Sequence, residues 1–259
     1  MRILSITAQK PNSTGSGVYL TELVKEYALL GHEQAVVAGV YREDEVELPD
    51  GVDFYPVYFC EEGLPYPIVG MSDEMPYIST KYCEMSPEMV EQFRSSFMSV
   101  IERAVEELQP ELILCHHLYL LTALVREHFP ERKVYGFCHN TDLRQMQKTD
   151  LERAFIRAQI GRLDHIFVPQ RAQEEGVLAL YPVSKEKITR VGMGYNDQIF
   201  HLADGSCNKE GVTSLVFAGK IAEKKGVMSL LRALALLENE KELDMDRIRL
   251  LLAGSTGNE

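Results

Sequence analysis

A histidine at the end of an apolar run is the residue of this sequence best suited to act on a ligand. His139 directly follows residues 134–138, which are typical of a buried strand. In sheets of parallel strands flanked by helices, ligands bind at the edge where the strands end. An imidazole there can orient or polarise a hydroxyl group near pH 7, so His139 is the candidate catalytic residue. The alternative is a structural histidine held by hydrogen bonds.

A glycine-rich segment after the first apolar run offers a second kind of chemistry. Gly15, Ser16 and Gly17 lie between a predicted strand at residues 2–7 and a helix whose apolar positions begin at Val18. Glycines let a ligand approach the backbone, and a helix N-terminus presents free N–H groups and a positive dipole. The segment therefore predicts a site for a phosphate or a sugar, with a ligand-free turn as the alternative.

The same segment leaves a nicotinamide dinucleotide open as the ligand. The dinucleotide motif requires a third glycine three residues after Gly17, where this sequence has Leu20. The motif also expects an acidic residue after the second strand to bind the ribose, and Glu43 and Asp44 lie near that position. An NAD-linked oxidoreductase with a Rossmann domain is therefore one alternative function.

A second glycine-bounded loop, residues 219–226, joins a predicted strand to a predicted helix. Its candidate ligand-binding residues are Gly219, Lys220 and Lys225, because lysines near a helix N-terminus can neutralise a diphosphate. The loop is not a Walker A motif, since no Gly-Lys-Ser/Thr follows at the required spacing. A solvated turn is the alternative for this loop.

We predict no metal site. A group of residues at the ends of two predicted strands has side chains of the types that bind zinc, but their spacing in the sequence does not match that of a zinc site. That group is Cys115, His116, His117, Cys138 and His139. An Asp-x-Asp pattern at residues 244–246 precedes a strand instead of following one, so we interpret it as a solvated connection.

Composition limits the partners and the compartment. The 259 residues carry 27 basic and 39 acidic side chains, a net charge of −12, which argues against binding to a nucleic-acid backbone. Three arginines on a predicted helix at residues 151–162 allow at most peripheral contact with an anionic membrane. The five cysteines are widely spaced, and no apolar run is long enough for a signal peptide or a membrane span. We therefore expect free thiols and a cytoplasmic protein.

The elements that must position these residues alternate between strands and helices. Strand patterns occur at residues 2–7, 35–40, 52–59, 112–115, 134–138, 165–168 and 188–191, and helical patterns at residues 18–30, 86–108, 120–129, 151–162 and 173–181. This alternation predicts an α/β fold with a Rossmann-type, doubly wound and mostly parallel sheet. Residues 60–85 form a long connection rich in glycine, proline and tyrosine, which is either part of an acceptor pocket or a packed insertion.

A break in the alternation divides the chain into two predicted domains. Residues 192–212 are rich in glycine, so we place one domain at residues 1–210 and the start of another at residues 211–259. The second contains a strand at 214–218, a helix at 227–237 and a strand at 249–253. Two strands cannot bury both faces of a sheet, so we expect this chain to be a truncated form of a longer protein.

Taken in order, these segments resemble a family 4 glycosyltransferase of the GT-B fold. The matching segments are Pro11 with Gly15–Gly17, residues 29–33, residues 134–142, residues 188–200, residues 217–226 and residues 250–254. Three departures from the family pattern stand out. Lys220 replaces the arginine of the diphosphate loop, residues 191–193 replace the proline and asparagine at the domain boundary, and the family's paired glutamates would follow residue 259.

The resemblance implies a retaining transfer of a sugar from a nucleotide-diphosphate sugar to an acceptor. The acceptor would be a carbohydrate or a lipid-linked molecule, and no cofactor beyond the donor substrate would be needed. His139 would position the donor sugar or the acceptor hydroxyl, while Asn140, Tyr195 and Asn196 would contact the acceptor or the domain interface. Without the rest of the donor site, residues 1–259 alone would be inactive. A relative that binds carbohydrate or a partner without catalysis is the second alternative.

Overall fold

The computed structural model describes residues 1–201, 211–219, 221, 223–242 and 244–254, and its chain divides into two compact units. Unit 1 comprises residues 1–194 and unit 2 comprises residues 195–259. The domain boundary predicted at residue 210 falls in the segment 202–210, outside the described residues, and stays a prediction. No helix within the described ranges is long and apolar enough to cross a membrane.

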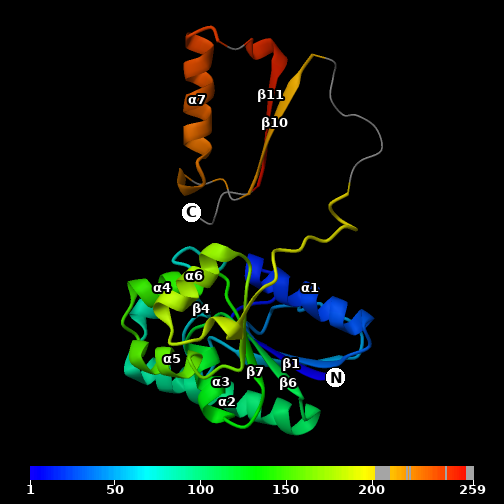
Figure 1. The fold of residues 1–259 in the computed structure, drawn as a ribbon, viewed down its shortest axis with the longest axis vertical. Coiled ribbons are helices and arrows are strands. Elements are labelled where there is room, and N and C mark those ends of the chain that lie inside the picture. Colours follow the sequence, from blue (N-terminus) through cyan, green and yellow to red (C-terminus); the bar gives the residue numbers. More distant parts are fainter. Residues whose placement is uncertain (202–210, 220, 222, 243, 255–259) are drawn as a thin grey trace. The chain divides into compact units, whose positions relative to one another are not determined.

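Unit 1 is built on a sheet of seven parallel strands (Figure 1). The strands are β1 (Arg2–Thr7), β2 (Glu33–Val40), β3 (Val52–Tyr58), β6 (Leu112–His116), β7 (Val134–Phe137), β8 (His165–Val168) and β9 (Ile188–Arg190). Their order is β3-β2-β1-β6-β7-β8-β9, so the direction of winding reverses between β1 and β6. This confirms the predicted α/β, doubly wound sheet and places its switch point at the ends of β1 and β6.

Helices cover both faces of the sheet, as the predicted alternation requires. They are α1 (Gly15–Leu29), α2 (Pro87–Leu108), α3 (Leu120–His128), α4 (Thr141–Lys148), α5 (Arg153–Ile160) and α6 (Arg171–Leu180). Leu20 and Val24 of α1 pack against Val36 and Ala38 of β2 on one face. The larger apolar core, which includes α2 and α3, lies on the other face.

Two local features differ from the predicted elements. Helix α1 begins at Gly15, so the glycine-rich segment is the first turn of the helix, and the Thr14 side chain caps it by accepting the N–H of Gly17. Helix α4 was not predicted. It begins at Thr141, two residues after His139, and its eight residues carry few apolar side chains in the periodic positions by which helices are recognised.

The connection at residues 60–85 is a packed insertion. It contains two short parallel strands, β4 (Val69–Gly70) and β5 (Thr80–Lys81), and a 3-10 turn, η1 (Tyr82–Glu84). Tyr66 and Tyr82 are buried in the main core, and the Tyr66 hydroxyl donates to the carbonyl of Met89 in α2. These rings therefore stabilise the insertion from within and are not available to stack on a ligand.

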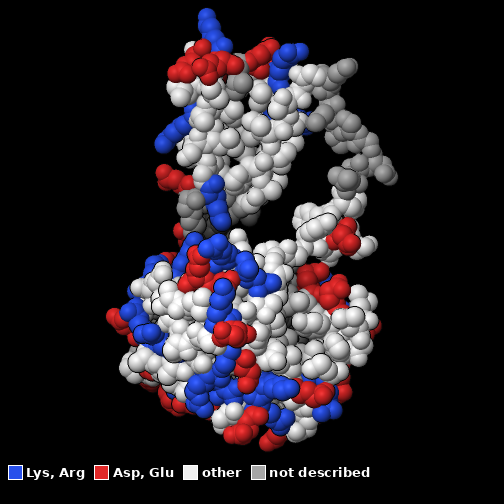
Figure 2. Space-filling model, in the orientation of Figure 1, with Lys and Arg blue, Asp and Glu red and all other residues white. Residues whose placement is uncertain are grey.

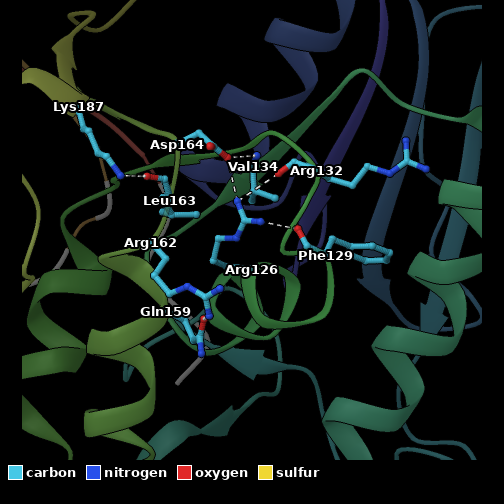
Figure 3. Close-up of polar contacts among 9 residues, drawn as sticks. All are labelled: Arg126, Phe129, Arg132, Val134, Gln159, Arg162, Leu163, Asp164 and Lys187. Atoms are coloured by element: carbon cyan, nitrogen blue, oxygen red, sulfur yellow. Dashed lines mark hydrogen bonds and ion pairs between the residues drawn. The ribbon is translucent and has the colours of Figure 1, made fainter.

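A buried arginine ties together the chain segments at the opposite edge of the sheet, where β7 begins (Figure 3). Arg126 is 3% exposed and donates to a carboxylate oxygen of Asp164 at 2.8 Å and to the carbonyls of Phe129 and Arg132. The same Asp164 oxygen accepts the N–H of Val134 at 2.9 Å. Arg126 thereby fixes α3 to the start of β7, and through β7 it sets where His139 emerges.

Unit 2 contains a β-α-β arrangement, in the order predicted. Strand β10 (Thr213–Ala218) pairs in parallel with β11 (Ile248–Ala253), and α7 (Val227–Asn239) connects them. Single 3-10 turns, η3 (Glu223–Lys225) and η4 (Met245–Arg247), precede α7 and β11. Val216 is 66% exposed and Leu251 40% exposed, so apolar strand side chains of this unit lie open to solvent.

Candidate functional site

The turns that follow β1, β6 and β7 bring three histidines and a serine together at the switch point. Strands β6 and β7 are in register with His116 opposite Phe137, so the residues that follow each strand emerge side by side. His117 comes directly after β6, His139 comes two residues after β7, and Ser16 lies in the first turn of α1. Two of these side chains, His139 and Ser16, were predicted from the sequence as site residues.

His139 is hydrogen-bonded to His116. The Nδ1 atom of His116 lies 3.1 Å from Nε2 of His139, and the ring planes differ by 16° with centroids 5.3 Å apart. On its other side His116 lies nearly parallel to Phe137, with ring centroids 5.0 Å apart. Tyr19 of α1 presents its ring edge-on to His139 at 5.5 Å. The His139 ring is thus held by an imidazole and an aromatic ring from two different elements.

A hydrogen bond between His117 and Ser16 links the end of β6 to helix α1. Nε2 of His117 lies 3.0 Å from the Ser16 hydroxyl, which also lies 3.1 Å from the hydroxyl of Thr14. His117 has a positive φ of 72°, a conformation that side chains other than glycine rarely adopt, and it turns the chain sharply out of β6. Its ring lies 4.7 Å from that of His139. The hydroxyl group of Ser16 is therefore within hydrogen-bonding distance of the His117 imidazole.

A buried carboxylate joins the two turns that carry the histidines. Asp142 of α4 is fully buried and accepts the backbone N–H of Leu118 at 2.8 Å and that of His139 at 3.3 Å. It also accepts the N–H of Leu143 and lies 3.6 Å from the thiol of Cys138. Burial raises the pKa of the Asp142 carboxyl, while these N–H donors oppose that rise. Asp142 fixes the β6 turn against the β7 turn.

The three histidines are neutral at pH 7. Burial lowers the pKa of His139 to about 4. Burial also holds the pKa of His116 well below its usual range, and the neighbouring His139 acts in the same direction. The pKa of His117 is lowered by burial and by both other imidazoles. At neutral pH the cluster therefore acts through hydrogen bonds and does not supply positive charge.

A shallow hollow in unit 1 opens beside His139. It is lined by side chains from α1, the ends of β7 and β8, and the segment after β9, including Tyr19, His139, Phe167, Pro169 and Met193. Its lining side chains are mostly aromatic and aliphatic, and the polar ones are those of Tyr19, Cys138 and His139. A largely apolar surface with a few hydrogen-bonding groups suits the ring face and hydroxyl edge of a sugar.

The glycines of the first helical turn have different structural roles. A Cβ on Gly17 would lie 2.6 Å from the carbonyl of Lys10, so this glycine is required for the close packing of the preceding turn. A Cβ on Gly15 would meet no atom within 4 Å, and Gly15 is exposed. The backbone near Gly15 and Ser16 is therefore the part of this turn that is open to a ligand.

Of the two acids proposed for a dinucleotide ribose, Asp44 is engaged within the chain and Glu43 is exposed. Asp44 forms an ion pair with Lys10 and accepts the backbone N–H of Tyr41 at 2.8 Å. Lys10 also lies over the rings of Tyr41 and Tyr77 at 5.0 and 5.2 Å. Asp44 is thus occupied in stabilising the connection at residues 60–85.

The remaining predicted site residues fall into two groups. Asn140 precedes α4 with a φ of 70°, and its side-chain oxygen accepts from Gln173 at 3.2 Å, so it belongs to the β7 turn. The others lie in unit 2. Tyr195 is 75% exposed, and the Asn196 side-chain oxygen accepts the N–H of Gln198. Gly219 has a φ of 147° and donates its N–H to Ala253, Lys225 is exposed in the turn before α7, and Lys220 lies outside the described residues.

The arginines considered for membrane contact are bonded within unit 1. Figure 2 shows basic side chains gathered in a band on the face drawn, with acidic side chains among them. Arg153 pairs with Asp150, Arg157 donates to the carbonyl of Leu180, and Arg162 donates to Gln159. Each of these three arginines thus has a partner within the chain, and no lipid surface is needed to account for its presence.

Sequence reasoning missed the roles of His116, His117 and Asp142. The two histidines were considered only as members of an unsupported zinc site. A partial signal is present, because a histidine directly follows each of the predicted strands at residues 112–115 and 134–138, and parallel strands end at the same edge of a sheet. Nothing in the sequence marks Asp142, since its role depends on which backbone N–H groups the fold brings to it.

Comparison with solved structures defines the class of protein. The chain matches sucrose-phosphate synthase from Thermosynechococcus elongatus with a TM-score of 0.68 at 15% identity, covering 98% of this chain and 62% of that one. It matches a glycosyltransferase from Rickettsia africae ESF-5 with a TM-score of 0.60 at 13% identity, covering 98% and 60%. Anabaena HepE, solved in complex with UDP and glucose, gives 0.59 at 14% identity, covering 99% and 61%. The fold is that of GT-B glycosyltransferases, and the chain spans about three fifths of their length.

A family model identifies the chain more closely. The model described as Glycosyltransferase Family 4 matches residues 13–198, well over half of the sequence. The chain belongs to glycosyltransferase family 4. A search of curated proteins gave no significant match. The matched range contains the whole switch-point cluster, from Ser16 to Asp142.

Proposed function

We propose that this chain is the acceptor-side part, together with the start of the donor-side part, of a retaining glycosyltransferase. The enzyme transfers a sugar from a nucleotide-diphosphate sugar to a carbohydrate or lipid-linked acceptor. The observation that carries this proposal is the convergence of His139, Ser16 and the first turn of α1 at the switch point of a family 4 chain. HepE, a structural relative, is described in complex with UDP and glucose, which supports a nucleotide-sugar donor.

His139 and the hollow beside it bind the sugar in this proposal. The imidazole is neutral at pH 7 because burial lowers its pKa to about 4, so it acts by hydrogen bonding to a hydroxyl and not as a proton donor. Ser16 and the open backbone at Gly15 face the diphosphate or the acceptor. Asn140 supports the β7 turn through its bond to Gln173.

Charge on the departing diphosphate is stabilised from the second glycine-bounded loop. Gly219, Lys220 and Lys225 are the residues proposed for this role, because a lysine near a developing negative charge lowers the barrier electrostatically. Tyr195 and Asn196 are proposed to contact the acceptor or the domain interface. Residues 1–259 alone are proposed to bind the donor weakly and to lack turnover.

The alternative of an NAD-linked oxidoreductase is disfavoured by two observations. The family match assigns residues 13–198 to glycosyltransferases, and Asp44 is engaged by Lys10 and Tyr41. A relative that binds without catalysis uses the same residues and differs only in turnover.

Thermal unfolding with candidate ligands tests the proposal. Residues 1–259 and the natural gene product are heated with UDP, GDP, ADP or NAD. A ligand present at about 100 times its Kd adds roughly 2.7 kcal/mol to the free energy of unfolding. We expect one nucleoside diphosphate to raise the Tm of the natural product by several degrees, and that of residues 1–259 less. A response to NAD alone supports the oxidoreductase instead. Binding without release of nucleotide from the matching sugar donor supports the non-catalytic relative.

A further inference from the structure

The hydrogen bond between His116 and His139 couples the protonation of their two rings. A neutral imidazole carries one N–H donor and one acceptor nitrogen. Nδ1 of His116 and Nε2 of His139 lie 3.1 Å apart, so one of these nitrogens carries the proton and the other accepts it. In the ring that donates, the other nitrogen is then an acceptor, and in the ring that accepts, the other nitrogen is then a donor. The pair therefore determines what His139 presents on its far side.

Two arrangements satisfy this bond, and they differ in stability. In the first, His139 Nε2–H donates to His116 Nδ1, and both rings are protonated on Nε2. In the second, His116 Nδ1–H donates to His139 Nε2, and both rings are protonated on Nδ1. An isolated neutral histidine side chain favours the Nε2–H tautomer, so the first arrangement has the preferred tautomer in both rings.

The first arrangement leaves Nδ1 of His139 as a hydrogen-bond acceptor. Among the described residues this atom has no hydrogen-bond partner, and it is not one of the buried side-chain atoms that lack one, so it reaches the surface. His139 lines the hollow bounded by Tyr19 and Phe167. An unprotonated nitrogen at this position can accept a hydrogen bond from a hydroxyl group. A sugar ring bound in the hollow would exclude water from this nitrogen, so the hydroxyl group would take the place of water as the donor.

We propose that His116 is a positioning residue that holds His139 in the Nε2–H tautomer, so that His139 Nδ1 accepts a hydrogen bond from a hydroxyl group of the sugar ligand. The tautomer half rests on the geometry of the histidine pair together with the intrinsic preference of a neutral imidazole for Nε2–H. The ligand half rests on the proposed function, because it takes the occupant of the hollow to be a sugar.

The surrounding structure keeps the two rings from adopting another arrangement. Asp142 accepts the backbone N–H of His139, and His117 donates its N–H to the carbonyl of Phe137 at 3.0 Å. These bonds fix the two turns relative to each other. Phe137 also lies parallel to the His116 ring, 5.0 Å from it, which limits rotation of that ring.

Nitrogen-15 NMR of the histidine side chains tests the tautomer, since protonated and unprotonated ring nitrogens resonate far apart. The spectra are recorded at pH 7 on residues 1–259, on His139→Gln to assign the signals, and on His116→Phe and His116→Asn. We expect His139 to show a protonated Nε2 and an unprotonated Nδ1. In His116→Phe, which keeps a ring but removes the acceptor, both His139 nitrogens should move toward intermediate shifts. His116→Asn, whose side-chain oxygen can accept the same proton, should restore the original pattern.

Three results would overturn the role of His116. A protonated Nδ1 on His139 in the unaltered chain reverses the tautomer. An unchanged His139 pattern in a folded His116→Phe chain, checked by near-ultraviolet circular dichroism, removes the coupling. If His116→Phe does not fold, the unaltered chain and His116→Asn decide, and intermediate shifts in a folded His116→Asn chain contradict the proposal.

A titration separates the ligand half from the proposed function. UDP-glucose, GDP-mannose and ADP-glucose are compared with UDP, GDP and ADP, with binding followed by thermal shift. A sugar nucleotide that binds and shifts the His139 Nδ1 signal, where its nucleoside diphosphate does not, supports the hydroxyl contact. Binding without that shift overturns the ligand half. If none of the six binds, the proposed function and the ligand half fail together, while the tautomer result stands.

Discussion

Acidification should destabilise unit 1 steeply, because three neutral histidines are buried at its switch point. His116, His117 and His139 each have a folded-state pKa below the usual value of 6.5, and that of His139 is about 4. Between these pKa values the unfolded chain binds protons that the folded chain does not bind. Stability is therefore greatest above pH 6.5 and is lost as the pH falls toward 4. Asp142, whose pKa is raised by burial, has the opposite effect in the acid part of this range.

The magnitude follows from proton linkage. One proton taken up on unfolding costs about 1.4 kcal/mol of stability for each pH unit below the unfolded-state pKa. Between pH 7 and about pH 5.5 each of the three histidines then contributes about 1.2 kcal/mol, or roughly 4 kcal/mol together. This is a large part of the roughly 5–15 kcal/mol by which a domain is stable.

Urea unfolding between pH 7 and about pH 5.5 measures this loss, with near-ultraviolet circular dichroism of tyrosine as the signal. Every tyrosine except Tyr195 lies in residues 1–194, so the signal reports unit 1. His139→Gln should remove about a third of the acid-dependent loss, whereas His201→Gln, which changes an exposed histidine of unit 2, should leave it unaltered. Stability that stays constant between these pH values would refute the burial of three neutral imidazoles.

Three further substitutions test the packing that positions the site, each measured by urea unfolding. Arg126→Leu should lower the free energy of unfolding by about 2 kcal/mol, which is less than removing one partner of a fully buried ion pair costs, because Asp164 is 44% exposed. Adding Asp164→Asn to Arg126→Leu should lower the free energy of unfolding only slightly further. Ser86→Ala removes the hydroxyl that caps α2 and should cost about 1 kcal/mol, with Ser86→Asp close to neutral. Gly39→Ala places a Cβ 2.4 Å from the carbonyl of Ala8 and should cost about 2–3 kcal/mol, whereas Gly15→Ala, at an open position, should cost far less.

The sheet could be predicted from sequence because its signals are local. The strand patterns at residues 2–7 and 112–115 and the Ser86-Pro87 start of α2 depend on side chains next to one another, and all appear in the structure. Helix α4 could not be predicted, since its buried residues include Asp142 and Gln145, whose polar groups are satisfied only by distant partners. Tertiary hydrogen bonds, not local propensity, stabilise that helix.

The candidate site could be predicted only in part, for a related reason. The place of His139 follows from the rule that ligands bind where parallel strands end. Its hydrogen-bond partner could not be deduced, because the sequence does not state which strands lie beside β7. The structure places β6, which carries His116, on one side of β7. The burial that keeps these imidazoles neutral also depends on Tyr19 from a helix more than one hundred residues away.

The uncharged state of the histidine cluster has a consequence for how salt affects ligand binding. Dissolved ions screen interactions between charges and have little effect on hydrogen bonds between neutral groups or on contacts with apolar rings. The affinity that unit 1 contributes through His139 and the hollow should therefore be nearly independent of ionic strength. Any affinity contributed by Lys225 should fall as salt is added, because this exposed lysine attracts its ligand by charge. A salt titration of ligand affinity thus separates the contributions of the two units without any substitution.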